Sequence, residues 1–148
     1  MAADEFSLIY RYFSSLGHGD AVDLGVGDDC AILRLDADER LATSVDTMVE
    51  SVHFPADAFP EDVGFRVVAA AASDLAAMGA RPLGMPDALT VPEPDEFWLH
   101  AFSEGLAAAV KAFTLPLVGG DTTRGPLTIS VQVFGALPVA AGLLRSGA

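Results

Sequence analysis

The sequence has few basic residues and almost no cysteine or lysine. Its 148 residues include 21 Asp and Glu against 8 Lys and Arg, which gives a formal net charge of −13 at pH 7. A chain this negative repels nucleic-acid phosphates and anionic lipids, so we expect neither nucleic acid nor membrane as a partner. Cys30 is the one cysteine, which excludes an internal disulfide and is typical of a reducing compartment.

Long hydrophobic runs are also lacking. No apolar stretch reaches the roughly 20 residues that a membrane-spanning helix needs. The N-terminal segment is acidic where a secretory signal is basic, and Arg11 interrupts its apolar residues. We therefore expect a cytoplasmic protein. Since 51% of the residues are hydrophobic, the chain has enough apolar side chains for one folded domain.

The scarcity of basic side chains limits how the protein could bind phosphates. Lys111 is the only lysine, so a lysine-rich phosphate cradle is excluded, and a carboxylate-bound divalent cation would have to supply the positive charge. The known phosphate loops are missing, because there is no GxxxxGK[ST] and GVGDDC at 25–30 lacks the third glycine of GxGxxG. The histidines and Cys30 do not have the spacing of zinc ligands.

Apolar periodicity and turn residues predict an α+β fold. Three segments have helical spacing, and the second of them begins at Pro60 and stops at Gly79: 4–17, 60–79 and 94–113. Extended structure is expected in five further segments, namely 21–35, 40–54, 81–92, 115–121 and 126–139. We expect a mixed or antiparallel sheet of four to five strands with helices on one face.

Several local features carry further expectations. The last strand has Phe134 and Ala136 on its second face, which indicates homodimerisation through the open face of the sheet. Pro86 is expected to weaken its strand, and the strand at 115–121 is expected to end at its two glycines. Cys30 is expected to be a small buried hydrophobic residue, and the aromatic residues at 97–102 are expected to lie in the core.

Acidic residues occur at unusual places in this pattern. Asp28 and Asp29 are adjacent at a glycine-rich bend, and Asp46 lies inside a strand, where Asp is depleted. Asp74 lies in an alanine-rich helix, and Asp121 follows two glycines that would let a ligand approach the backbone closely. Each alone is explained by a turn, a strand end or a solvated helix face. Together they are typical of a site for Mg²⁺, which prefers hard oxygen ligands.

The motifs around these acids resemble those of the bacterial thiamine-monophosphate kinase family, within the aminoimidazole ribonucleotide synthetase-like superfamily. They follow in the same order and cover nearly the whole chain: GVGDDCA (25–31), SVDTMVESVHF (44–54), SDLAAMGARP (73–82), GGDTTRGPL (119–127) and LLRSGA (143–148). The resemblance implies that residues 1–148 form a single ATP- and Mg²⁺-binding N-terminal domain. Family members continue into a C-terminal domain, which this chain would lack.

The resemblance also implies roles for individual residues. A first set would bind several Mg²⁺ ions beside ATP: Asp29, Ser44, Val45, Asp46, Asp74 and Asp121. A second set would contact the nucleotide, namely Gly120, Asp121 and Arg145, and His53 would contact thiamine phosphate. Asp28 is expected to be a turn or outer-shell acid. Val45 departs from the family, where Thr is common, so only its backbone carbonyl could contact a metal.

The implied activity is ATP-dependent phosphorylation of thiamine phosphate to thiamine diphosphate with Mg²⁺ ions, and the isolated fragment is expected to be inactive. Two alternatives remain open on the sequence. One is another ATP-dependent synthetase of the same superfamily, although the SDLAAMGA and GGDTTRG motifs favour the kinase. The other is a non-catalytic module for dimerisation and nucleotide binding.

Overall fold

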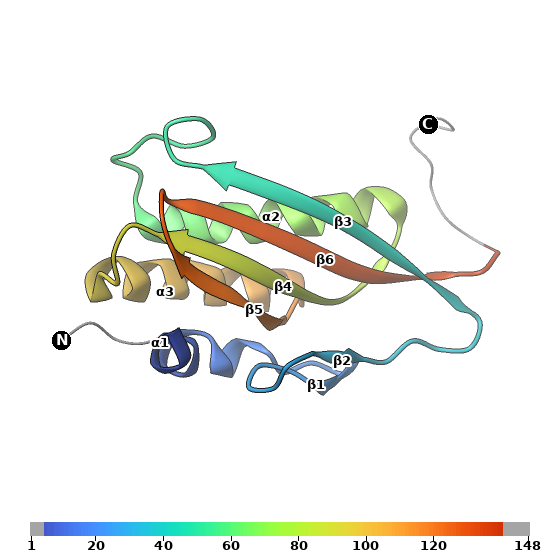
Figure 1. The fold of residues 1–148 in the computed structure, drawn as a ribbon. Coiled ribbons are helices and arrows are strands. Elements are labelled where there is room, and N and C mark those ends of the chain that lie inside the picture. The colour runs from blue at the N-terminus through green and yellow to red at the C-terminus, as the bar shows by residue number, and fades with distance from the viewer. Residues whose placement is uncertain (1–4, 141–148) are drawn as a thin grey trace.

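The fold is a four-stranded sheet with two long helices on one face (Figure 1). The structure, a computed structural model, describes residues 5–140. Its elements follow the chain in this order: α1 (Glu5–Tyr12), the 3₁₀ helix η1 (Ser14–Leu16), β1 (Val22–Leu24), β2 (Ile32–Leu33), β3 (Glu39–Val49), α2 (Pro60–Met78), β4 (Arg81–Val91), α3 (Glu96–Phe113), β5 (Leu117–Arg124) and β6 (Thr128–Pro138).

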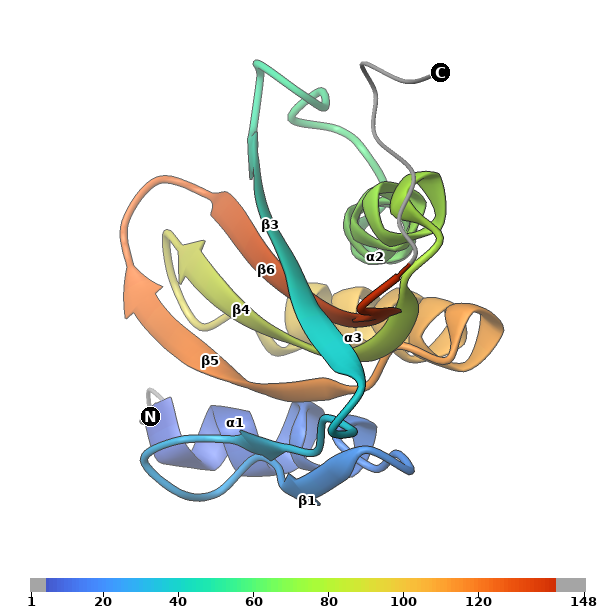
Figure 2. The same cartoon turned by 90° about the vertical axis from the view of Figure 1, so that its right-hand side faces the viewer.

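The main sheet has the strand order β3-β6-β4-β5, and β1 and β2 form a separate antiparallel pair. β6 is antiparallel to both β3 and β4, whereas β4 and β5 are parallel, so the sheet is mixed. Helices α2 and α3 cover one face, while α1 and the β1–β2 hairpin lie along the β5 edge (Figure 2). The α+β prediction, with helices on one face of a mixed sheet, is confirmed.

The two long helices have the ends that their sequences predict. α2 begins at Pro60, with Glu61 and Asp62 at the positive end of the helix dipole, and is capped by Gly79. α3 begins after Asp95, whose carboxylate accepts hydrogen bonds from the backbone N–H groups of Phe97 and Trp98. These local signals therefore fix where the two helices start.

Helices α2 and α3 pack closely because each has a glycine at the contact. A β-carbon at Gly105 would lie 1.9 Å from the Glu61 carbonyl oxygen, and one at Gly64 would lie 2.4 Å from the Phe102 carbonyl oxygen. The pair then buries its apolar side chains against the sheet, where Ile129 and Val131 of β6 are fully buried. Each such aliphatic side chain contributes roughly 1.5–3 kcal/mol through its burial.

The open face of the sheet is partly covered by the chain itself. Leu83 and Ala136 form a second small cluster with Ala21, and Leu33 and Phe134 pack against it. The β1–β2 hairpin thus covers the end of the second face on which the sequence placed Phe134 and Ala136. The large apolar residues that stay exposed near this end come from β3 and from the segment around β2.

The strand that contains Pro86 is irregular, as expected: β4 is a central strand whose pairing with β5 shifts register at Met85–Pro86. Three other local expectations are wrong in whole or in part. β5 continues through its glycines to Arg124, because it pairs with β4 along this length. Cys30 is exposed, since it lies in the loop before β2. Among the aromatic residues at 97–102, Phe102 is fully buried and Trp98 packs against the core, but Phe97 in the first turn of α3 is 91% exposed.

Among residues 5–140, no helix is both long enough and apolar enough to span a membrane.

Candidate functional site

Asp46 and Asp74 lie together where β3 faces helix α2. The Ser44 hydroxyl donates a hydrogen bond of 3.4 Å to Asp74 Oδ2, so Ser44 and the two acids form one polar group. Along β3, Ser44 and Asp46 are half-buried, whereas Val45 between them is 62% exposed. The period of two in a strand therefore turns Ser44 and Asp46 towards α2 and the side chain of Val45 away from it.

The environment of this pair disfavours two negative charges. Partial burial raises the pKa of the Asp46 carboxyl, and the hydrogen bond and repulsion from Asp74 raise that pKa further. Two carboxylates at hydrogen-bonding distance hold either a shared proton or a cation between them. Ser44, Asp46 and Asp74 thus present oxygen atoms suited to a hard divalent cation.

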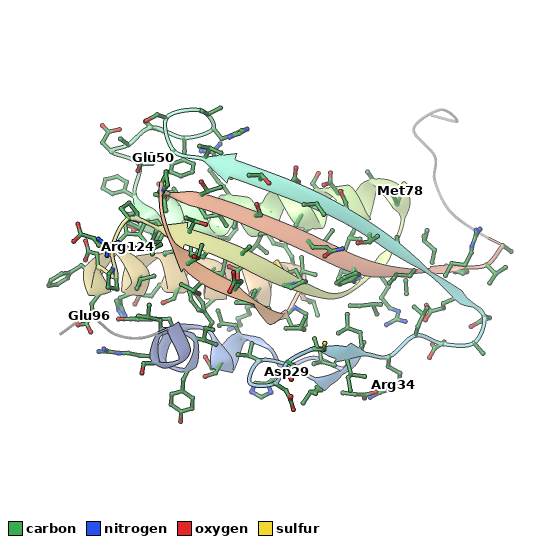
Figure 3. The ribbon with its side chains drawn as sticks, viewed as in Figure 1. Asp29, Arg34, Glu50, Met78, Glu96 and Arg124 are labelled. Atoms are coloured by element: carbon green, nitrogen blue, oxygen red, sulfur yellow. The ribbon has the colours of Figure 1, made fainter. Side chains whose placement is uncertain are left out.

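A second acidic group lies on a cavity of about 270 Å³ at the β5 edge. Asp29 and Asp121 both line this cavity, although one comes from the loop between β1 and β2 and the other from β5. Figure 3 shows Asp29 in that loop. Asp28 lines it as well, and its Oδ1 accepts a 2.8 Å hydrogen bond from the Asp29 backbone N–H. That contact links Asp28 to the backbone of the loop that carries Asp29.

Gly120 shapes the cavity wall between these acids. Its φ of 148° lies in the region that favours glycine, and a β-carbon there would stand 1.7 Å from the carbonyl oxygen of Asp87 on β4. A β-carbon at the preceding Gly119, in contrast, would meet no atom within 4 Å. The backbone is therefore open at Gly119, where a ligand can approach it closely, and is closed by Asp87 at Gly120.

Asp87 is a residue of this cavity that the motifs do not include. It lines the cavity, is 7% exposed, and its Oδ2 makes no hydrogen bond to any residue that the structure describes. Burial raises the pKa of the Asp87 carboxyl to about 7, against a smaller opposing effect of its own backbone N–H. The signal that could have identified it is an Asp at a position in phase with the buried Met85 and Leu89.

The two acidic groups lie at opposite edges of the main sheet. Asp46 is on β3 and Asp121 on β5, the two outer strands, so three strand spacings, or about 14 Å, separate their backbones. Within residues 5–140, no three His, Cys, Asp or Glu side chains are close enough together to hold a metal ion by themselves. The four predicted metal-binding aspartates are thus arranged as two groups.

The two groups of carboxylates fit an Mg²⁺ ion that is also bound to a phosphate. Mg²⁺ in proteins is usually held by one or two carboxylates, and phosphate oxygens and waters complete its octahedron. A pair such as Asp46 and Asp74 meets that requirement, and the described residues lining the β5-edge cavity include carboxylates but no Lys, Arg or His. Both groups therefore suit a cation that arrives with a phosphate ligand.

His53 lies in the loop after β3 and is held in a defined orientation. Its Nδ1 accepts a 2.9 Å hydrogen bond from the Val49 backbone N–H, and its own backbone N–H donates to the Val49 carbonyl. Because Nδ1 accepts, the neutral ring carries its proton on Nε2, which is then free to donate to a ligand. Arg145, the predicted ATP contact, lies outside the described residues.

The molecule is thus an α+β domain with one group of carboxylates at each edge of a mixed sheet. The family described as AIR synthase related protein, N-terminal domain, matches residues 27–137, and the chain belongs to this family.

Individual relatives agree with the resemblance seen in the motifs. Thiamine-monophosphate kinase from Salmonella typhimurium is 47% identical over 100% of this chain and 46% of its own length. Thiamine-monophosphate kinase from Stenotrophomonas maltophilia K279a has a crystal structure that superposes with a TM-score of 0.84 at 42% identity, over 98% of this chain and 46% of that one. The resemblance to this kinase family is confirmed.

A second related structure contains ligands. AaThiL complexed with AMPPCP and TMP superposes with a TM-score of 0.67 at 27% identity, over 70% of this chain and 34% of that one. The chain spans about half the length of the curated relatives that it matches.

Proposed function

We propose that this chain is the nucleotide- and Mg²⁺-binding part of a thiamine-monophosphate kinase. The enzyme would transfer the γ-phosphoryl group of ATP to a phosphate oxygen of thiamine phosphate, giving thiamine diphosphate and ADP. The observation that carries the proposal is the arrangement of oxygen donors, Asp46 with Asp74 and Asp29 with Asp121, on a domain whose cavity at β5 has acidic but no basic residues among its described lining. The likeness to the Salmonella kinase over the whole chain supports it.

The metal ligands would come from both groups. Ser44, Asp46 and Asp74 would bind Mg²⁺ on the α2 side of β3, with the Val45 carbonyl beside them, while Asp29 and Asp121 would bind it at the β5 edge. When bound, these ions would neutralise the negative charge of the ATP phosphates, which a chain with one lysine cannot do with side chains.

Other residues would position the two substrates. Gly120 would contact the nucleotide, which the open backbone at the neighbouring Gly119 would let approach β5, and Arg145 would contact ATP. His53 would donate from Nε2 to thiamine phosphate, since its Nδ1 is occupied by Val49. Phosphoryl transfer depends mainly on positioning and charge neutralisation, and the acceptor phosphate is already anionic, so a strong general base is unnecessary.

The protein would act as a homodimer through the open face of its sheet. Leu41 and Val45 of β3 are 52% and 62% exposed, and Ile32 and Leu35 are exposed nearby. Leu41 and Leu35 line a groove of about 510 Å³ together with Phe134. In a monomer these apolar side chains are exposed to water, and packing against a second copy would bury them.

Calorimetric titration with ATP tests the metal-binding residues. We expect binding with Mg²⁺ present and its loss in excess chelator. Asp46→Asn should weaken binding more than tenfold, or roughly 1.4 kcal/mol or more, because one ligand of the cation is lost. Asp57→Asn, which removes one exposed charge elsewhere, is the matched control and should bind like the parent protein. ATP binding that chelator leaves unchanged would contradict the proposal.

A further inference from the structure

We infer that Asp87 is an additional ligand for a divalent cation, in the cavity that Asp29 and Asp121 line. The inference rests on the metal site proposed above, since Asp29 and Asp121 are ligands there, but it concerns the protein without nucleotide and is tested without kinase activity. It rests on the burial of Asp87, on the surroundings of its carboxyl group and on the charges around the cavity.

Asp87 lies among apolar neighbours on the helix-facing side of the sheet. In the register of the sheet it stands beside Val131 of β6 and Gly120 of β5, and Val131 is fully buried. Residues directly opposite each other on antiparallel strands point to the same face, so Asp87 faces the core as Val131 does. A carboxylate placed there needs hydrogen-bond donors or a cation, since burial of an uncompensated charge is costly.

The described protein groups leave half of that carboxyl group unsatisfied. Oδ2 of Asp87 is inaccessible and has no hydrogen-bond partner among the described residues. The neighbouring oxygen, Oδ1, is packed over Gly120, since a β-carbon at that glycine would lie 2.7 Å from it. An unpaired buried oxygen beside a cavity is the arrangement expected where a bound group completes the site.

The charge of the cavity determines what that group is. Asp28, Asp29, Asp87 and Asp121 line it, and its described lining includes no Lys, Arg or His. This lining therefore offers no positive side chain to compensate the buried carboxyl group of Asp87. Carboxylate oxygens without soft or nitrogen donors favour a hard divalent cation such as Mg²⁺ or Mn²⁺. Because Mg²⁺ needs only one or two carboxylates, Asp87 with Asp29 suffices.

Titration with Mn²⁺ alone, followed by calorimetry, tests this ligand without ATP or thiamine phosphate. Asp87→Asn keeps the shape of the side chain and removes its charge. We expect it to weaken Mn²⁺ binding at least about tenfold, which is the loss that follows removal of a group supporting a metal site. Asp57→Asn is the matched control, since it removes an exposed charge that lines a different cavity, and it should change the affinity less than twofold.

Thermal unfolding separates this role from a merely structural one. Mn²⁺ should raise the melting temperature of the parent protein more than that of Asp87→Asn, because a cation that binds the folded state stabilises it by mass action. In chelator, Asp87→Asn should have the higher melting temperature of the two proteins, since its Asn side chain carries no buried charge. Equal Mn²⁺ affinities and equal Mn²⁺-induced shifts for the two proteins would overturn the inference.

A crystal structure of the parent protein with Mn²⁺ keeps the inference testable even if Asp87→Asn fails to fold. We expect an anomalous peak bonded to a carboxylate oxygen of Asp87. Peaks only at Asp46 and Asp74, or a water molecule in place of the metal at Asp87, would overturn the inference and leave the proposed kinase activity untouched.

Discussion

Gly120 of β5 and Asp87 of β4 are register partners on neighbouring parallel strands, and no β-carbon fits between them. The shortest contact, 1.7 Å to the Asp87 carbonyl oxygen, involves backbone that cannot rotate away. With a φ of 148° as well, this position requires glycine. The cavity that Asp29 and Asp121 share therefore depends on a contact between the central strand β4 and the outer strand β5.

Gly120→Ala should destabilise the protein by about 3 kcal/mol or more, because β5 must move away from β4 and alanine is strained at this φ. The control is Gly119→Ala, whose β-carbon meets nothing within 4 Å, and it should change the free energy of unfolding by less than about 1 kcal/mol. Denaturant unfolding measures both changes. Similar losses in the two variants would contradict the role of the Gly120–Asp87 contact.

Stability should fall in acid through the ion pair between Glu39 and Arg81. Arg81 Nη2 donates to Glu39 Oε1 at 2.6 Å, and this hydrogen bond, together with one from the Asp36 backbone N–H, lowers the pKa of Glu39 from its ordinary 4.5. The unfolded chain then binds more protons in acid than the folded one. The stabilisation is complete above the unfolded value and is lost as the pH falls through the lower folded value.

Denaturant unfolding at pH 7 and pH 3 checks this dependence. The parent protein should lose more stability on acidification than Glu39→Gln, whose side chain does not ionise, so the gap between the two proteins should narrow at pH 3. Glu93→Gln, at another exposed site, should follow the parent protein at both values. A gap of the same size at both pH values would show that the pair contributes nothing through its charge.

The open face of the sheet should mediate dimerisation. Sedimentation at tens of micromolar, which is roughly the range where an interface of standard size is populated, should give a dimer. Val45→Lys should shift the protein to monomer, because it places a charge on the exposed surface of β3. Val52→Lys is matched in chemistry, lies at a 73% exposed position in the loop after β3, and should leave the dimer intact. A monomeric parent protein would contradict the dimer.

The helices could be predicted because their signals are local. Pro60 and Gly79 bound α2 in the sequence as they do in space. The extent of β5 could not be predicted in this way, because Gly119 and Gly120 are strand breakers in isolation and are kept extended by pairing with β4. The same tertiary pairing explains how Pro86 can lie in a central strand.

The candidate site, too, could be predicted only in part from the sequence. The positions of Asp46 and Asp121 stand out in the sequence, since acids are rare inside strands and after paired glycines. Their grouping depends on the fold, because helix α2 brings Asp74 to Asp46 and the β1–β2 loop brings Asp29 to Asp121. The sequence alone does not single out Asp87, since its burial depends on the helices that cover β4.

The last prediction concerns turnover. This chain carries both acidic groups, so it should bind Mg²⁺ and ATP, but it spans 46% of the length of the Salmonella kinase. In-line transfer requires the reacting atoms to be held about 3–3.5 Å apart, and a domain that binds mainly one of the two substrates cannot hold them so. We expect the 148-residue chain to form negligible thiamine diphosphate from thiamine phosphate and ATP, and a chain extended past Ala148 to form it readily. Chromatography of the product measures both rates, and Asp46→Asn in the extended chain should abolish its activity. Full activity in the 148-residue chain would show that the whole substrate site lies within it.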